Sequence, residues 1–106
     1  MKYKDWNIEA LTGYKPISTF YMDFSIADHF GKAAIRDTYK RAVEAWINDY
    51  KMLTELVMVL NWKIWEHYEQ HEEIAQLYQD MYMELNSWAL DHLEGDELTY
   101  YYQTTN

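Results

Sequence analysis

The 106-residue chain is 49% hydrophobic with only three glycines and one proline, which excludes a disordered or repeat-array protein and indicates one folded domain. It has no cysteine, so neither a disulfide framework nor a thiolate metal site can form. The net charge of −9 comes from the segment after Lys63, since residues 64–106 contain ten Asp or Glu and no Lys or Arg. This acidic charge argues against binding to nucleic acid or to membrane surfaces.

The N-terminal segment 1–17 is predicted to be a loosely attached arm. Asp5 can cap a short helix that runs to Leu11, with Gly13 just past its end. Lys15 and Pro16 then predict an extended link, because a residue before proline is disfavoured in a helix. The opening sequence contains no apolar run typical of a signal peptide, so we expect a cytoplasmic protein.

A first core helix is predicted between Thr19 and Phe30. Ser18 or Thr19 can cap its beginning, and Gly31 is suited to its end. Its apolar residues, which we expect to cover one end of the core, include Phe20, Phe24, Ile26, Ala27 and Phe30.

The central part of the chain, residues 32–69, has the apolar period of a helix. Residues spaced alternately by four and three form one stripe: Tyr39, Val43, Trp46, Tyr50, Leu53, Val57, Leu60 and Ile64. The unchanged phase favours one continuous helix of about 57 Å. The alternative is a break near residues 48–50, because Asn48 and Asp49 prefer caps and turns. The segment Met52–Trp65 is apolar on nearly every side, so it is predicted to be the hub of the core.

A second long helix is predicted over residues 72–94. Polar residues near Gln70 and His71 indicate a turn before it, and Gly95 is suited to its end. Its expected inner face consists of Ile74, Tyr78, Met81, Leu85, Trp88 and His92. Asp96 can cap a final short turn, and residues 103–106 are expected to fray. The sequence therefore predicts an all-α, small antiparallel helical bundle.

Four stretches resemble a known family. They are DFSIADHFG at 23–31, AIRDTYKRA at 34–42, TELVMVLNWKIWEHYE at 54–69 and DHLEGDELTYYYQTT at 91–105. In these stretches, and so over almost everything after Ser18, the chain is similar to small, acidic, uncharacterised proteins encoded in conjugative transposons and related mobile elements of Gram-positive bacteria. The resemblance implies a helical protein in a mobile-element setting. It supplies neither a reaction nor functional residues.

The pair His67 and His71 is the one candidate metal site in the sequence. Two histidines four residues apart on a helix can share a metal ion, and nearby glutamates could add a ligand. We expect the helix to end between them, however, which would spoil the geometry of a shared metal ion. The pair is therefore interpreted as two surface histidines, with no metal and no cofactor. Nothing resembles a catalytic triad or a phosphate-binding loop, so no catalytic residues and no enzyme are expected.

The 72–94 helix also carries a candidate partner-binding face. A helical wheel places four acidic residues in a narrow stripe and two apolar residues on the otherwise polar back: Glu73, Asp80, Glu84 and Asp91, with Met83 and Leu90. Apolar side chains on a polar face indicate a second contact.

These patterns predict a non-enzymatic accessory protein that acts through protein–protein contacts, with a partner that is basic. Homodimerisation through the same back face is an alternative use of that surface. The alternative function is an acidic DNA mimic that inhibits a host restriction or immunity nuclease, because carboxylates on one helix face repeat at about the spacing of DNA phosphates.

Overall fold

The computed structural model describes residues 15–105, with side chains from residue 19 onward. The part of the chain that it describes is helical: α3 (Lys15–Asp28), α4 (Lys32–Trp46), α5 (Tyr50–His67), α6 (Glu72–His92) and α7 (Asp96–Thr105). The predicted all-α bundle is confirmed. The short helix expected at 5–11 lies outside the described residues.

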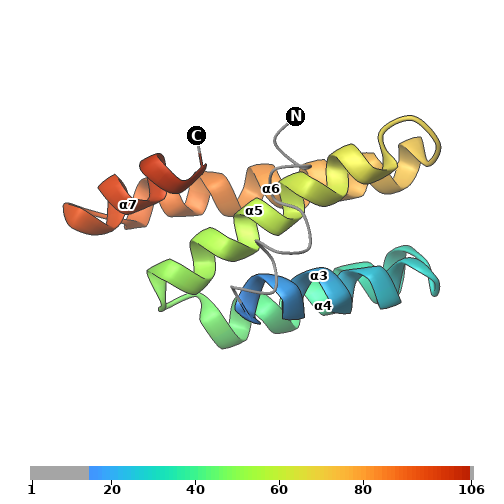
Figure 1. The fold of residues 1–106 in the computed structure, drawn as a ribbon, viewed down its shortest axis with the longest axis horizontal. Coiled ribbons are helices and arrows are strands. Elements are labelled where there is room, and N and C mark those ends of the chain that lie inside the picture. Colours follow the sequence, from blue (N-terminus) through green and yellow to red (C-terminus); the bar gives the residue numbers. More distant parts are fainter. Residues whose placement is uncertain (1–14, 106) are drawn as a thin grey trace.

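Helix α5 is the centre of the bundle and contacts the four other helices of the described chain. In Figure 1, α3 and α4 lie along one side of α5, and α6 and α7 lie along the other. Seven of its residues are at most 2% exposed: Leu53, Thr54, Leu56, Val57, Val59, Leu60 and Lys63. These positions fall on several sides of the helix, so the predicted hub at Met52–Trp65 is confirmed.

The region 32–69 is two helices, so the preference for one continuous helix was wrong and the predicted break is correct. Helix α4 ends at Trp46 and α5 begins at Tyr50. The carboxylate of Asp49 accepts hydrogen bonds from the backbone N–H groups of Lys51 and Met52, both at 3.1 Å. This N-cap satisfies two donors that the start of a helix would otherwise leave unpaired.

The other boundaries between helices lie at Gly31, at Gly95 and at a polar turn near Gln70. Gly31 has a φ of 103° and Gly95 a φ of 57°, conformations that residues with a side chain rarely adopt. The turn predicted near Gln70 is confirmed, because α5 ends at His67 and α6 begins at Glu72.

Both ends of the described chain are more helical than predicted. Helix α3 begins at Lys15, so the extended link at Pro16 was wrong. Proline is tolerated in the first turn of a helix, because the N–H group that it lacks would have no intrahelical partner at that position. Helix α7 reaches Thr105, whose hydroxyl donates to the carbonyl of Tyr101 at 2.7 Å, so residues 103–105, which were expected to fray, are helical. Asn106, the last residue of that prediction, lies outside the described residues.

The core joins buried side chains from all five described helices, among them Phe24, Ile35, Leu56, Tyr78 and Tyr101. None of the described helices is sufficiently long and apolar to cross a membrane.

Candidate functional site

A buried polar cluster lies where the end of α3 meets the end of α5. Its centre is Lys63, whose side chain is fully buried. The ammonium lies 2.7 Å from Oδ2 of Asp28, 2.6 Å from Oε2 of Glu66 and 3.2 Å from the hydroxyl of Ser25. An ammonium has three protons to donate, and these three oxygens match that number. The charge is therefore buried with a complete set of acceptors.

Two tyrosines complete the surroundings of the ammonium. Tyr78 donates to Oδ1 of Asp28 and Tyr21 donates to Oε1 of Glu66, both at 2.6 Å. The centres of the Tyr21 and Tyr78 rings lie 4.9 and 5.8 Å from Nζ of Lys63, within the range of cation–π attraction. Burial, together with the neighbouring carboxylate, raises the pKa of Tyr21 to about 12 and raises the pKa of Tyr78 above its usual range.

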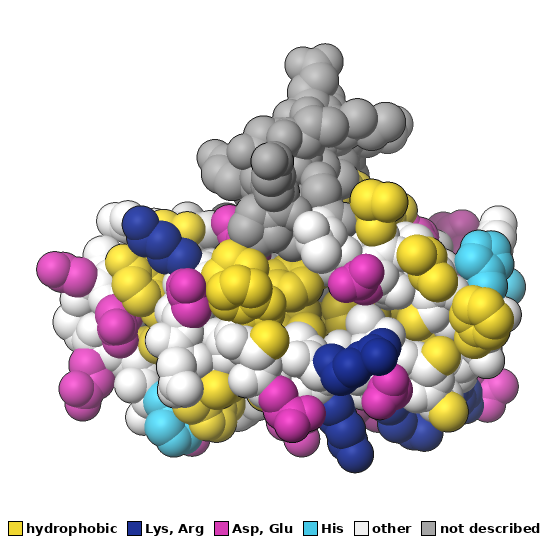
Figure 2. All heavy atoms as spheres, turned by 90° about the horizontal axis from the view of Figure 1, so that it is seen from below, with side chains coloured by type: hydrophobic (Ala, Val, Ile, Leu, Met, Phe, Trp, Pro, Cys, Tyr) yellow, Lys and Arg dark blue, Asp and Glu magenta, His cyan; other side chains and the backbone are white. Residues whose placement is uncertain are grey.

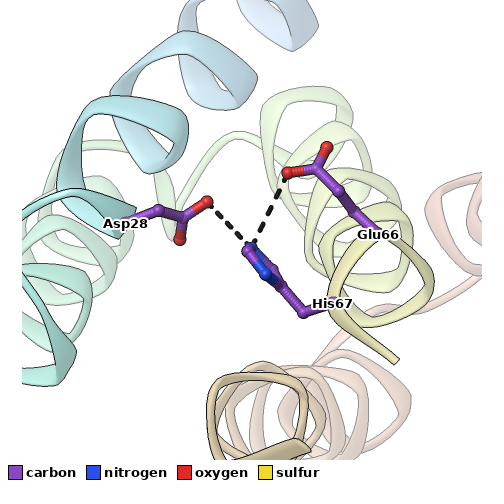
Figure 3. Close-up of side chains that lie close together, drawn as sticks. All are labelled: Asp28, Glu66 and His67. Atoms are coloured by element: carbon purple, nitrogen blue, oxygen red, sulfur yellow. Dashed lines mark hydrogen bonds and ion pairs between the residues drawn. The ribbon is translucent and has the colours of Figure 1, made fainter. Parts of the chain in front are cut away.

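His67 is the third functional group that faces Asp28 (Figure 3). Its Nε2 lies 2.9 Å from Oδ2 of Asp28, and its ring stacks nearly parallel to that of Tyr78 at 5.7 Å. Nδ1 is buried and has no hydrogen-bond partner among the described residues. The geometry therefore favours an Nε2–H that donates to Asp28, because a proton on Nδ1 would be left without an acceptor.

Asp28, Glu66 and His67 together resemble the ligand set of a metal centre. They each offer one ligand atom, and these atoms lie within 4.8 Å of one another. The ammonium of Lys63, however, already lies against both carboxylates. A divalent ion at the same place would meet a cation at close range in a buried site, where like charges repel strongly. The cluster does not fit a metal ion while Lys63 is present.

The two histidines predicted as weak candidates do not share a helix face. The helix ends at His67, and the exposed His71 immediately precedes α6. Their ring centres are 5.5 Å apart in an edge-on arrangement. His67 is buried, so its interpretation as a surface histidine was wrong. It contacts Asp28, a residue of α3 that the sequence pattern did not single out. The available signal was Lys63, a charged residue inside the apolar hub.

The predicted partner-binding face of α6 is on the surface. Met83 and Leu90 are 55% and 40% exposed, and Asp91 is exposed as well. Two of the acidic residues are engaged with α4, because Glu73 pairs with Lys32 at 3.2 Å and Glu84 accepts the hydroxyl proton of Tyr39 at 2.7 Å.

The acidic stripe therefore lies beside cations. Asp80 and Glu84 line a cleft of about 310 Å³ between α4 and α6, and Arg36 and Lys40 line its other wall. Asp80 also accepts a hydrogen bond from Gln76 at 2.9 Å. The stripe is less uniformly negative than the helical wheel of α6 alone predicts.

A groove between α3 and α4 was missed by the sequence analysis. It has a volume of about 530 Å³ and is lined by Ile26, Phe30 and Trp46, among others. These side chains are 57%, 77% and 38% exposed, so the expectation that Ile26 and Phe30 cover the core was wrong. The buried face of α3 is made by Phe20, Phe24 and Ala27. Apolar residues lie on both faces of α3, so their pattern did not show which face would be covered.

No family model matches this chain, and no significant match was found among curated proteins or solved structures.

Proposed function

We propose that the protein is a non-enzymatic interaction factor that binds a basic protein partner through the outer face of α6. The observation that carries the proposal is the exposure of Met83 and Leu90 within a strongly acidic region. Residues 72–105, which form α6 and α7, contain eight Asp or Glu and no Lys or Arg. Apolar contacts would supply affinity, and the carboxylates would attract a basic surface and repel nucleic acid.

The polar cluster supports a structural rather than a catalytic role. The three protons of the Lys63 ammonium are matched by acceptors within the fold. Neither the cleft between α4 and α6 nor the groove between α3 and α4 is lined by Lys63, Glu66 or His67. A catalytic group must reach a substrate, and a charge enclosed by its own partners has no such access.

The setting of this factor is proposed from the sequence resemblance alone. On that basis we propose an accessory protein of a mobile genetic element, and the cytoplasmic location expected from the sequence is part of the same proposal. The DNA-mimic alternative receives less support from the geometry. Lys32 neutralises Glu73, and Arg36 lies in the cleft beside Asp80, so cations interrupt the row of carboxylates.

The test is capture of partners from a bacterial lysate at low salt. Wild-type protein is compared with a Met83→Ser/Leu90→Ser variant and with an Asp80→Lys/Asp91→Lys variant. Glu84 is left unchanged because Tyr39 donates to it. The matched controls are Tyr68→Ser, which removes an exposed ring elsewhere, and Glu44→Lys/Glu69→Lys, which makes the same charge change away from the α6 stripe.

We expect one specific partner to be held by the wild type and by both controls, and to be lost from both α6 variants. Equal capture by all five proteins would contradict the proposal. A nucleic-acid enzyme that is lost only on charge reversal would instead favour the DNA mimic.

A further inference from the structure

The cleft between α4 and α6 has walls of opposite charge. Arg36 and Lys40, which lie one helical turn apart, line its α4 wall, and Asp80 and Glu84, also one turn apart, line its α6 wall. All four residues are exposed. Figure 2 views the molecule from the side where α3 and α4 lie in Figure 1, and it shows Lys and Arg side chains among Asp and Glu side chains there. Two cations and two carboxylates therefore border one opening.

The remaining lining of the cleft is apolar or aromatic. It consists of Tyr39, Leu77 and Met81, which are 8%, 7% and 5% exposed. The volume of about 310 Å³ is at the lower end of the range of about 300–1,000 Å³ for small-molecule sites. An apolar lining with a few polar groups is typical of such sites. The cleft therefore has room for a small molecule with a short apolar part.

The charges of the two walls are not paired with each other. Among the described residues, neither Arg36 nor Lys40 forms an ion pair. The carboxylates are held by neutral donors instead, since the hydroxyl of Tyr39 donates to Glu84 at 2.7 Å and the amide of Gln76 donates to Asp80 at 2.9 Å. A carboxylate has about four lone-pair positions, so each can accept further hydrogen bonds. The cleft thus offers a ligand both cationic donors and carboxylate acceptors.

Two contacts between α4 and α6 set the distance between the walls. Burial, together with the hydrogen bond to Glu84 and its charge, raises the pKa of Tyr39 above its usual range, so the hydroxyl keeps its proton and donates to that carboxylate. In the first turn of α4, Lys32 pairs with Glu73. Arg36 lies between these two contacts in the sequence of α4. The walls are therefore held in place by the fold before a ligand binds, which lowers the cost of binding.

The charges of the walls select the class of ligand. An anion would be attracted by Arg36 and Lys40 but repelled by the carboxylates opposite, and the reverse holds for a cation. A molecule with both an ammonium and a carboxylate matches both walls. The guanidinium of an arginine presents paired N–H donors that suit a carboxylate. An α-amino acid carries the two charged groups on one carbon, and an apolar side chain would match Leu77 and Met81.

We propose that the α4–α6 cleft binds an α-amino acid with an apolar side chain, in its zwitterionic form. The carboxylate of the ligand pairs with the α4 cations, its ammonium pairs with the α6 carboxylates, and its side chain contacts the apolar lining. This site is independent of the partner proposed for the outer face of α6, because neither Met83 nor Leu90 lines the cleft.

The experiment is a titration of the isotope-labelled full chain with leucine at neutral pH, followed by the NMR chemical shifts of the backbone amides. We expect saturable shifts in α4 and α6 around Arg36 and Asp80, with a Kd of about 1 mM because a small ligand in an open cleft makes few contacts. Two matched probes each lack one charge, since isocaproate has no ammonium and isopentylamine has no carboxylate. Each is expected to bind at least about tenfold more weakly than leucine, because one charged wall then has no partner.

Two variants locate the binding within the cleft. Arg36→Gln removes a cation, and Glu84→Gln removes a negative charge but keeps an oxygen to which Tyr39 can donate. Each is expected to weaken leucine binding by at least about tenfold. Arg41→Gln and Glu44→Gln make the same substitutions at exposed positions of α4 outside the cleft, and both are expected to bind leucine as the wild type does.

A wild type without saturable shifts would overturn the inference. Equal binding of leucine and either single-charge probe would do so as well, because the paired charges would then not select the ligand. Unchanged leucine binding in both Arg36→Gln and Glu84→Gln would place the ligand outside the cleft. Capture of a lysate partner by the Met83→Ser/Leu90→Ser variant reports on the outer face of α6 alone, so failure of that proposal is distinguishable from failure of this one.

Discussion

Lys63 and Asp28 form an ion pair inside the bundle, with 2.7 Å between the ammonium nitrogen and Oδ2 of the carboxylate. The pair joins the middle helix α5 to the end of α3. An enclosed ion pair adds little net stability over apolar residues of the same shape, because both charges lose their hydration. Removal of one partner is different, since it leaves the other charge buried without compensation.

Replacement of the central ammonium is therefore expected to be strongly destabilising. A Lys63→Met variant keeps the length of the side chain but leaves Asp28 and Glu66 facing each other as carboxylates. We expect the free energy of unfolding to fall by about 3–5 kcal/mol, measured by urea denaturation. The double variant Asp28→Asn/Lys63→Met should be less affected, because one uncompensated charge is removed with the cation.

The control for this prediction is Lys32→Met. Lys32 pairs with Glu73 on the surface, where the Glu73 side chain is 84% exposed, so its loss is expected to change the free energy of unfolding by less than about 1 kcal/mol. If Lys63→Met is no more destabilising than this control, the interior ion pair does not hold the two helices together.

Zinc should distinguish the wild type from a variant that lacks the ammonium. In the wild type, a slight excess of zinc is expected to leave Tm unchanged, because Lys63 occupies the space between the carboxylates. With Lys63 present, the ligand atoms of Asp28, Glu66 and His67 lie within 4.8 Å of one another, and Lys63→Ala removes the cation that competes for them. Zinc should then bind the folded state and raise Tm. The rise should disappear in Lys63→Ala/His67→Ala, and a rise in the wild type would contradict our account of the cluster.

The acid stability of the protein should depend on Asp28. Burial alone would raise the pKa of Asp28, but hydrogen bonds from Lys63, Tyr78 and His67 hold it below its ordinary value of 3.8. The unfolded chain therefore binds the Asp28 proton more tightly than the folded state does. The ionised carboxylate stabilises the folded state fully at a pH above its ordinary pKa, and this stabilisation is lost as the pH falls through the lowered pKa of the folded state.

The measurement is a series of urea denaturations of wild type and Asp28→Asn between neutral pH and the acid range. The difference in the free energy of unfolding between the two proteins should shrink below about pH 4. Asp91→Asn, which removes a carboxylate from the exposed face of α6, is the matched control for the loss of one negative charge. A constant difference for Asp28→Asn across the series would refute the assignment.

Much of the fold could be predicted from the sequence because local chemistry determines it. Gly31 and Gly95 mark turns, and the polar residues around Gln70 separate α5 from α6. The break after Trp46 shows where periodicity alone is insufficient. The spacing of apolar residues is unchanged across it, although Trp46 of that stripe is 38% exposed, and the capping carboxylate of Asp49 decides the outcome.

The site could be predicted only in part, because it depends on contacts between distant segments. The sequence shows that Lys63 lies in an apolar hub, but its acceptor Asp28 belongs to another helix. The exposure of Met83 and Leu90 follows from the period of one helix. The exposure of Ile26 does not, because it depends on which side of α3 meets α4 and α5.

Glu55 gives the last prediction, because its carboxylate is buried without a matching cation. The residue is 9% exposed, and within the described chain its Oε2 has no hydrogen-bond partner. Burial raises the pKa of Glu55, and the nearby charge of Asp49 adds to the effect. The folded state therefore binds the proton more tightly than the unfolded chain, so the ionised carboxylate lowers stability at neutral pH and this loss disappears on acidification.

A Glu55→Gln variant is accordingly expected to be more stable than the wild type at neutral pH, by about 1 kcal/mol in the free energy of unfolding. The gain should diminish as the pH falls through the raised pKa of the carboxyl group, because the wild-type side chain then becomes neutral as well. Glu44→Gln serves as the control, because it makes the same substitution at an exposed position of α4. If Glu55→Gln is instead less stable than the wild type at neutral pH, the carboxylate has a stabilising partner in solution, and its burial is not a source of strain.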